Sequence, residues 1–243
     1  MQQPDNSAWL DADHVRQYVE RQKTSSPIEA ELFAVLARLL RSLPSKPGRI
    51  LDLGCGAGRF GRAIMDVFDW VDVTFSDLSA EMLTAAREAV GENERASFLE
   101  ADLAETAWRD VFGQQRFDVI VSGFSLHHLA RDRRREVVDD MPRLLRPGGL
   151  LVVAEWVASP SAWLEQVHNR WFVETSWHGG VFEGDSATFE QTLERFANRE
   201  DVTQGLLLPM DEQIGWLAEA GLDDVSCFWK TFDMAMFGGR RPA

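Results

Sequence analysis

The feature that most constrains the fold is a regular alternation of short apolar segments with helical patterns between residues 49 and 156. Repeated strand–helix–strand units of this kind predict a parallel sheet with helices on both faces. In such sheets, ligands bind beyond the carboxyl ends of the strands. The predicted strands are RILDL (49–53), VDVTFSD (71–77), ASFLEAD (96–102), FDVIVSG (117–123) and LLVVAEW (150–156), and the predicted helices are GRFGRAIMDVF (58–68), SAEMLTAAREAV (79–90, with Ser79 as N-cap) and RREVVDDMPRLL (134–145).

The C-terminal part of the chain has a different pattern. MDEQIGWLAEAGL (210–222) predicts a helix that ends at Gly221, and two strand-like runs, DVSCFWKTF (224–232) and MAMFGGRR (234–241), follow it. Only Asp233 separates the two runs, and so short a link permits only an antiparallel hairpin. We therefore expect the sheet to end in an antiparallel edge.

Two segments lie outside this alternation, and both are expected to cover the carboxyl edge of the sheet. The first is the N-terminal 45 residues, which have helical patterns. The second, residues 157–208, has no strand pattern and is rich in aromatic residues. The predicted division is a helical cap segment (1–45), a cofactor-binding core (46–156), an aromatic-rich helical cap insertion (157–208), and a C-terminal helix with hairpin that completes the core (209–243).

Composition excludes several functional classes. The net charge of −14 and the pI of about 4.8 make binding to nucleic acid or to a membrane surface a poor hypothesis. The basic run RDRRR (131–135) is interpreted as a solvated helix face. Two cysteines without metal-binding spacing indicate a reducing compartment and predict no metal site. Since no apolar stretch reaches about 18 residues and the N-terminus is polar, we expect a cytoplasmic protein.

A glycine-rich loop follows the first predicted strand, in the stretch LDLGCGAGRFG (51–61). It fits G-x-G-x-x-G, a dinucleotide fingerprint, through Gly56, Gly58 and Gly61. It also fits D-x-G-x-G-x-G through Asp52, Gly54, Gly56 and Gly58. Either loop brings backbone N–H groups and a helix N-terminus close to a ligand, so the glycines alone do not identify the cofactor.

Several motifs in the right order make the chain from Arg49 to Arg241 resemble the class I S-adenosylmethionine-dependent methyltransferases. The resemblance implies an α/β, Rossmann-like, three-layer fold with a seven-stranded, mostly parallel sheet and one antiparallel edge strand, plus the helical cap. It also implies S-adenosyl-L-methionine as cofactor. The motifs are ILDLGCGAGRF, FSDLSAEML, FLEADL, FDVIVSGFSLHHL, LLRPGGLLVVAEW and LAEAGLDDVSCFWKTF.

Three acidic residues at strand ends suit this cofactor. Asp52 would hold the loop and attract the ammonium group, and Asp77 would accept both ribose hydroxyls, as it would in a dinucleotide fold. Asp102 discriminates, because its carboxylate can accept from the adenine amine with the Leu103 N–H nearby. Each acid has a structural alternative: a strand-end turn for Asp52, a helix N-cap for Asp77, and a surface turn for Asp102. The other predicted cofactor residues are Tyr18, Arg21, Gly54, Cys55, Gly56, Gly58, Leu78 and Gly123.

Histidine is the natural base near neutral pH for a methyl acceptor that loses a proton. His127 and His128 follow the fourth strand on its carboxyl side, and Glu155 ends the fifth strand at the same edge. His178 lies in ETSWHGGVF (174–182), whose composition suggests a mobile loop that closes on a ligand. Either member of the histidine pair could instead be a packing residue, and the loop could be an ordinary turn packed by aromatics.

The leading functional hypothesis is a methyltransferase that acts on a small, apolar or aromatic acceptor. A peptide or protein acceptor is the main alternative within this chemistry. Two hypotheses of other classes are an NAD-dependent oxidoreductase, disfavoured by Asp102 and the terminal hairpin, and a non-catalytic protein that only binds S-adenosylmethionine. The sequence leaves the acceptor atom and the oligomeric state open.

Overall fold

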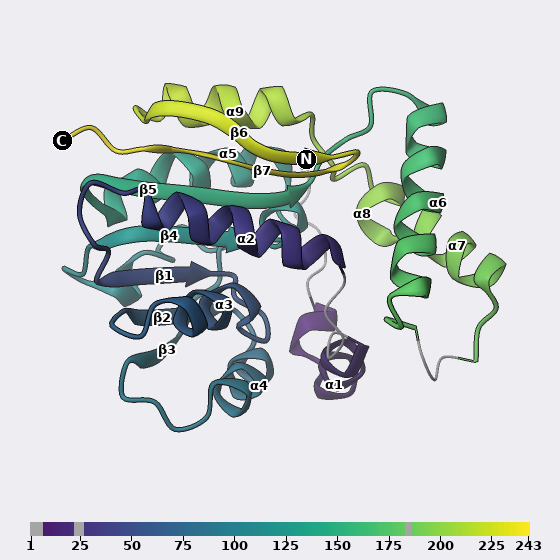
Figure 1. Ribbon diagram of the computed structural model, residues 1–243, viewed down its shortest axis with the longest axis horizontal. Helices are drawn as coiled ribbons and strands as arrows, with labels where there is room; N and C mark the ends of the chain where they lie inside the picture. The colour runs from purple at the N-terminus through teal and green to yellow at the C-terminus, as the bar shows by residue number, and fades with distance from the viewer. Residues whose placement is uncertain (1–6, 22–26, 183–185) are drawn as a thin grey trace.

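The computed structural model describes residues 7–21, 27–182 and 186–243, and its centre is a seven-stranded sheet (Figure 1). The strand order is β3-β2-β1-β4-β5-β7-β6. The strands are β1 (Arg49–Leu53), β2 (Asp72–Asp77), β3 (Ala96–Glu100), β4 (Phe117–Gly123), β5 (Leu145–Trp156), β6 (Asp223–Thr231) and β7 (Met234–Arg240). The α-helices are α1 (Ala12–Arg21), α2 (Pro27–Arg41), α3 (Arg59–Val67), α4 (Ala80–Val90), α5 (Arg131–Asp140), α6 (Ala162–His178), α7 (Phe189–Ala197), α8 (Glu200–Thr203) and α9 (Met210–Glu219).

The sheet confirms the predicted fold class. Strands β1 to β5 are parallel, and β7 runs antiparallel to both of its neighbours, β5 and β6. The turn between β6 and β7 is as tight as expected, with Phe232 at a φ of 49° beside Asp233. Because β7 fits between β5 and β6, the antiparallel strand lies one place inside the edge, and β6 is the outermost strand.

Two layers of helices cover the two faces of the sheet. Helices α2, α3 and α4 contribute side chains to one core cluster, whereas α5 and α9 contribute to the cluster on the other face. The buried residues of α2 recur every four positions, at Ile28, Leu32, Leu36 and Leu40, which places them on one side of the helix. Helix α2 therefore packs on a face of the sheet as part of the core layers, although it was expected in the cap.

Local sequence signals fix most of the element boundaries. Ser79 is the N-cap of α4, since its hydroxyl accepts a hydrogen bond from the Met82 N–H at 3.2 Å. The helix expected at 134–145 lies earlier, at Arg131–Asp140. It is followed by a 3₁₀ turn at Met141–Leu144, because Pro142 has no N–H to continue an α-helix.

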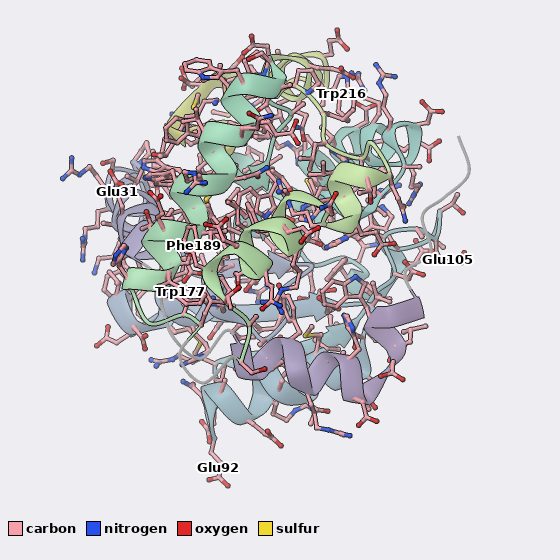
Figure 2. All side chains as sticks on the ribbon, turned by 90° about the vertical axis from the view of Figure 1, so that its right-hand side faces the viewer. Glu31, Glu92, Glu105, Trp177, Phe189 and Trp216 are labelled. Carbon is pink, nitrogen blue, oxygen red and sulfur yellow. The ribbon has the colours of Figure 1, made fainter. Side chains whose placement is uncertain are left out.

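Several helices gather at the end of the sheet to which the parallel strands point. The 3₁₀ helix η1 (Ser7–Leu10) and α1 lie there, and so do α6 and α7, which Figure 2 shows facing the viewer. Residues 174–178 form the last turns of α6, so the expectation of a loop is wrong for them. The four-part division of the chain stays a prediction. Among the helices that the structure describes, none is long and apolar enough to cross a membrane.

Candidate functional site

The loop after β1 forms the floor of the site. Gly54 and Gly56 have φ angles of 66° and 51°, in the left-handed region that glycine adopts without strain. A Cβ on Gly54 would lie 1.9 Å from the Ser125 Oγ. Only glycine at position 54 therefore allows this loop to lie so close to the turn after β4.

Asp52 braces this loop from below. Its side chain is almost fully buried and accepts a hydrogen bond from the Gly61 N–H at 2.8 Å, which ties β1 to the first turn of α3. Burial raises the pKa of Asp52 to about 7, and the negative charge of Asp77 adds to that rise. Asp52 does not line the cavity described below, so the structure places it in the predicted loop-holding position and away from direct ligand contact.

Asp77 ends β2 and connects the glycine loop to α4. One carboxylate oxygen accepts from the Gly56 N–H at 2.8 Å and the other from the Ser79 N–H at 3.0 Å. Burial raises the pKa of this carboxyl, and the nearby charge of Asp102 raises it further, against the opposing effect of the backbone hydrogen bonds. The alternative that Asp77 is the helix N-cap is wrong, since Ser79 has that position.

Asp102 lies in the turn after β3, where one of its carboxylate oxygens accepts from the Ala104 N–H at 2.8 Å. Arg133 holds this turn from α5, because its guanidinium donates to the carbonyl oxygens of Leu103 and Glu105 at 2.7 and 2.6 Å. One residue of the basic run at 131–135 thus anchors an acidic turn of the site.

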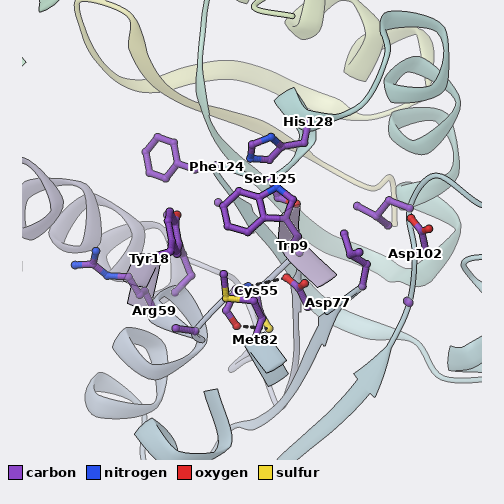
Figure 3. Close-up of a pocket in the computed structure, with 18 of the residues that line it drawn as sticks. Trp9, Tyr18, Cys55, Arg59, Asp77, Met82, Asp102, Phe124, Ser125 and His128 are labelled. Carbon is purple, nitrogen blue, oxygen red and sulfur yellow. Dashed lines mark hydrogen bonds between the residues drawn. The ribbon is translucent and has the colours of Figure 1, made fainter. Parts of the chain in front are cut away.

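A cavity opens at the carboxyl ends of the four neighbouring strands β3, β2, β1 and β4 (Figure 3). Its empty space, including the open mouth, measures about 910 Å³. The predicted residues that line it are Tyr18, Gly54, Cys55, Gly56, Asp77, Leu78, Asp102, Leu103, Gly123 and His128. Sequence reasoning missed the lining residues Trp9, Glu29, Ala57, Arg59, Phe60, Met82, Ala101, Phe124, Ser125 and Leu129.

The other predicted residues lie elsewhere. Gly58 precedes α3 with a φ of 77°, outside the cavity lining. His178 ends α6, where its Nδ1 pairs with the Glu174 carbonyl oxygen of its own helix at 2.8 Å. Arg21 ends α1, and its side chain lies outside the described part of the structure.

The turn after β4 forms the opposite wall of the cavity. Phe124 has a φ of 53°, which is uncommon for a residue with a side chain and often marks a functional site. The Glu155 carboxylate, fully buried at the end of β5, accepts from the N–H groups of Ser125 and Leu126 at 3.1 and 2.6 Å. It also pairs with the His127 Nδ1 at 2.6 Å.

The two histidines of this turn have different surroundings. His127 is buried against Glu155 and does not line the cavity, whereas His128 does. Their rings pack with centroids 4.1 Å apart. Burial lowers the pKa of His128 well below its usual range, and the charges of His127 and Arg134 lower it further. The lowered pKa leaves the His128 ring unprotonated near pH 7 and also makes it a weak base.

The N-terminal segment closes over the cavity. The Trp9 ring makes edge contacts with Tyr18 and His128, with centroids 4.9 and 5.2 Å apart, and Figure 3 shows it between His128 and Asp77. Arg59, at the first turn of α3, forms an ion pair with Glu29 of α2 at 2.5 Å. The Trp9–His128 contact and the Arg59–Glu29 ion pair join segments far apart in sequence, so no local pattern could reveal them.

The aromatic side chains of the insertion pack on one another and against one core cluster of the sheet. Phe172 of α6 stacks on Phe196 of α7, with centroids 4.5 Å apart, and both pack against Trp156. The fully buried His168 joins this cluster. Among the described residues of 157–208, none lines the cavity.

The side chains of the cavity fit S-adenosylmethionine better than a dinucleotide. Asp77 places a carboxylate where the ribose hydroxyls of either cofactor could donate hydrogen bonds. Asp102 makes the difference, because its carboxylate suits the adenine amine. The described residues contain no group of three or more His, Cys, Asp or Glu side chains that could hold a metal ion.

Comparisons with known proteins agree with this site. A family profile described as a methyltransferase domain matches residues 50–149. Carboxy-S-adenosyl-L-methionine synthase of Chromohalobacter salexigens is 29% identical over 196 residues, which cover 76% of this chain and 66% of that protein. Ribosomal RNA small subunit methyltransferase C of Actinobacillus pleuropneumoniae is 35% identical over 114 residues, which cover 44% and 32%. The chain thus spans a third to two thirds of the length of these relatives.

Solved structures show the same architecture. The N-methyltransferase NodS of Bradyrhizobium japonicum, in complex with S-adenosyl-L-homocysteine, superposes with a TM-score of 0.59 at 19% identity, over 90% of each chain. At this identity the likeness concerns the fold. The profile match shows that residues 50–149 form a methyltransferase domain, and the sheet that contains it has the fold of a known N-methyltransferase structure.

Proposed function

We propose that this protein transfers a methyl group from S-adenosylmethionine to a small acceptor of apolar or aromatic character. The observation that carries this proposal is the composition of one cavity. Beside the glycine loop it is lined by Asp77 and Asp102, which suit the cofactor. The opposite wall contains Phe124 and His128, and Trp9 covers the cavity.

The cofactor-binding roles follow from the positions of the lining residues. Asp77 would accept hydrogen bonds from the ribose hydroxyls, and Asp102, with the Leu103 N–H, would hold the adenine edge. Gly54, Gly56 and Gly123 would allow the close approach of backbone groups near the ammonium. The bound cofactor would supply an activated methyl group on a sulfonium, so the protein has to align the acceptor, exclude water and manage a proton.

His128 is the proposed proton acceptor. It lines the cavity with its ring unprotonated near pH 7, although its lowered pKa makes it a weak base. An acceptor O–H or N–H becomes more acidic as the methyl group bonds to its oxygen or nitrogen, so His128 would take that proton. A bound cofactor would supply the methyl group, and its sulfur would keep the electron pair of the carbon–sulfur bond. The proton of the acceptor ends on the imidazole of His128.

The acceptor class is argued from the walls and from the charge of the chain. Trp9, Tyr18, Phe60 and Phe124 give the cavity an apolar, aromatic lining, which favours an acceptor of the same kind. The names of the relatives point to different molecules, including ribosomal RNA. A net charge of −14 disfavours RNA for this chain. Both cysteines are free, which supports a reducing, cytoplasmic location as part of this proposal.

Calorimetry and a transfer assay would test the proposal. The protein should bind S-adenosylmethionine and S-adenosylhomocysteine and should not bind NAD. With cofactor that carries a radioactive methyl group, label should enter the low-mass fraction of a cell extract and not its protein or RNA fractions. Label in protein would favour the peptide alternative, and NAD binding alone would favour an oxidoreductase. Cofactor binding without transfer to any fraction would favour a non-catalytic binding protein.

A further inference from the structure

The turn of residues 125–129, which carries His128 into the cavity wall, is held by a buried charge on each side. On the N–H side, the Glu155 carboxylate is fully buried and has three partners: the Ser125 N–H, the Leu126 N–H and the His127 Nδ1. A single acid at the end of β5 thus fixes the start of the turn and the ring that packs against His128.

On the carbonyl side, Arg134 of α5 has the matching position. Its side chain is fully buried, and its Nη2 donates to the carbonyl oxygens of His127 and Leu129 at 3.0 and 3.1 Å. The same nitrogen donates to the Leu206 carbonyl oxygen at 2.7 Å, near the C-terminal end of the insertion. Arg134 therefore connects the turn to the segment 157–208.

Fold stability alone is a poor explanation for this arrangement. A buried charge is expensive to desolvate, and well-packed apolar residues often stabilise a protein as well or better. The Nε and Nη1 atoms of Arg134 have no hydrogen-bond partner among the described residues, which adds to that cost. The arrangement instead fixes the geometry of the turn, because five of the six side-chain hydrogen bonds that Glu155 and Arg134 make with described residues are to residues 125–129.

We propose that Glu155 and Arg134 are positioning residues that fix the turn 125–129, and with it the ring of His128, at the wall of the cofactor cavity. Neither side chain lines the cavity, so both act through the turn. The functional importance of this positioning rests on the proposed role of His128 as proton acceptor. The positioning itself concerns this chain alone and can be tested without an acceptor.

The variant Glu155→Gln changes the contact with the His127 ring and keeps the contacts with the backbone N–H groups. Its amide oxygen can still accept from the Ser125 and Leu126 N–H groups, but its NH₂ group then faces the His127 Nδ1. A donor there disfavours the tautomer that carries a proton on Nδ1. The variant Arg134→Lys retains the charge and offers a single nitrogen in place of the planar guanidinium.

The readout is the set of histidine ring signals in ¹⁵N-labelled protein, assigned with His127→Gln and His128→Gln. We expect the native His127 to carry its proton on Nδ1. In Glu155→Gln, its Nδ1 signal should move toward the unprotonated position. The His128 signals should move as well, and their response to S-adenosylhomocysteine should change. Arg134→Lys should move the His128 signals while the His127 Nδ1 stays protonated.

Asp118→Asn is the matched control. Asp118 lies at the opposite end of the sheet, where its carboxylate accepts from the N–H groups of Gly48 and Arg49 at 2.8 Å each and from Arg146. This variant should lose stability and leave every histidine signal unchanged.

Two results would overturn the positioning roles: unchanged His128 signals in Glu155→Gln and Arg134→Lys, or equal movement in Asp118→Asn. If one variant fails to fold, the other gives the answer. If the native protein does not bind S-adenosylhomocysteine, the proposed function fails, and the ligand-free signals still decide the positioning question.

Discussion

Two segments cover the carboxyl end of the sheet, η1–α1 and α6–α7, and their aromatic residues have different roles. Both are helical and both contain tryptophan. Trp9 and Tyr18 of the first segment line the cavity, with the Trp9 ring against His128. In the second, Phe172 and Phe196 stack on each other, and no described residue of 157–208 reaches the cavity.

The difference shows that aromatic content does not identify a ligand-binding segment. The aromatic side chains of the insertion contact one another and one core cluster of the sheet, away from the cavity. The described part of η1–α1 is too short to bury a core of its own, so its aromatic rings pack on the site. We therefore expect changes in the insertion to alter stability, and changes in the cavity or in η1–α1 to alter cofactor affinity.

The largest expected effect is an opposite pH dependence of the two regions. Burial raises the pKa of Asp52, below the cavity, to about 7 and lowers the pKa of His168, in the insertion, to about 3. Between pH 4 and 7 the folded state holds a proton on Asp52 that the unfolded state releases, so this residue makes stability fall as pH rises. The unfolded state binds a proton on His168 below about pH 6.5, so that residue makes stability rise with pH.

Urea unfolding between pH 4 and 6.5 would separate these two contributions. Relative to the native protein, Asp52→Asn should gain stability as pH rises and His168→Asn should lose it. Each difference should amount to at most about 3.4 kcal/mol over the full window, at 1.36 kcal/mol per pH unit. Asp77 and Asp233 also have raised pKa values and remain in both variants, so differences from the native curve exclude them. Parallel curves for the two variants would contradict the assignment.

A large effect on stability alone is expected for Phe172→Ala. The partly buried ring stacks on Phe196 and packs against Trp156 with centroids 5.1 Å apart, so its removal opens the contact between the insertion and the sheet core. We expect a loss of about 2 kcal/mol in the free energy of unfolding, less than for a fully buried phenylalanine, with the affinity for S-adenosylhomocysteine within twofold of the native value. Trp163→Ala, on the same helix but 68% exposed, should change stability by less than about 0.5 kcal/mol. A large affinity loss in Phe172→Ala would place the insertion in the binding site.

The sequence predicted those parts of the site that depend on local signals. The glycine loop, the strand-end acids Asp77 and Asp102, and the N-cap Ser79 all follow from short patterns that leave the chain few alternatives. The antiparallel hairpin follows in the same way, because a one-residue link between strands has few geometries.

The parts that the sequence did not reveal depend on contacts between distant segments. Glu155 was noted only as a strand-end acid, and its three partners lie about thirty residues away. Trp9 contacts His128, although most of the core strands lie between the two residues in the sequence. Position 124 has a positive φ but is occupied by phenylalanine, whereas glycine or asparagine is the residue that would indicate this conformation in a sequence. Such contacts arise from tertiary packing, which composition and periodicity do not encode.

On the cavity side, Asp77→Ala should weaken cofactor binding by about 1.5–3 kcal/mol, the range for a hydrogen bond to a charged group. This corresponds to a roughly 10- to 150-fold rise in the Kd for S-adenosylhomocysteine. Calorimetry would measure it. Asp72→Ala, at the exposed amino end of the same strand, is the control and should leave the Kd unchanged. Equal affinities in the native protein and Asp77→Ala would show that Asp77 only holds the glycine loop and does not bind the cofactor.

The smallest expected effect, and the sharpest comparison of the two segments, comes from their tryptophans. Trp9 covers the cavity through edge contacts with Tyr18 and His128, and such aromatic pairs contribute about 0.5–1.5 kcal/mol each. Trp9→Ala should therefore lower stability by about that amount, and because the ring also lines the cavity it should raise the Kd for S-adenosylhomocysteine by about two- to tenfold. Trp177 of the insertion contacts Phe182 and Phe189, so Trp177→Ala should lower stability and leave the Kd unchanged.

Hydrogen exchange would show whether the same division holds for the backbone. Added S-adenosylhomocysteine should protect amides of residues 7–21 in the native protein and protect them less in Trp9→Ala, because the ring couples this segment to the cavity wall. Amides of residues 162–178 should exchange at the same rate with and without the ligand, because α6 packs on the insertion core and not on the site. Protection of α6 upon binding, or equal Kd values for native protein and Trp9→Ala, would reverse the roles assigned to the two segments.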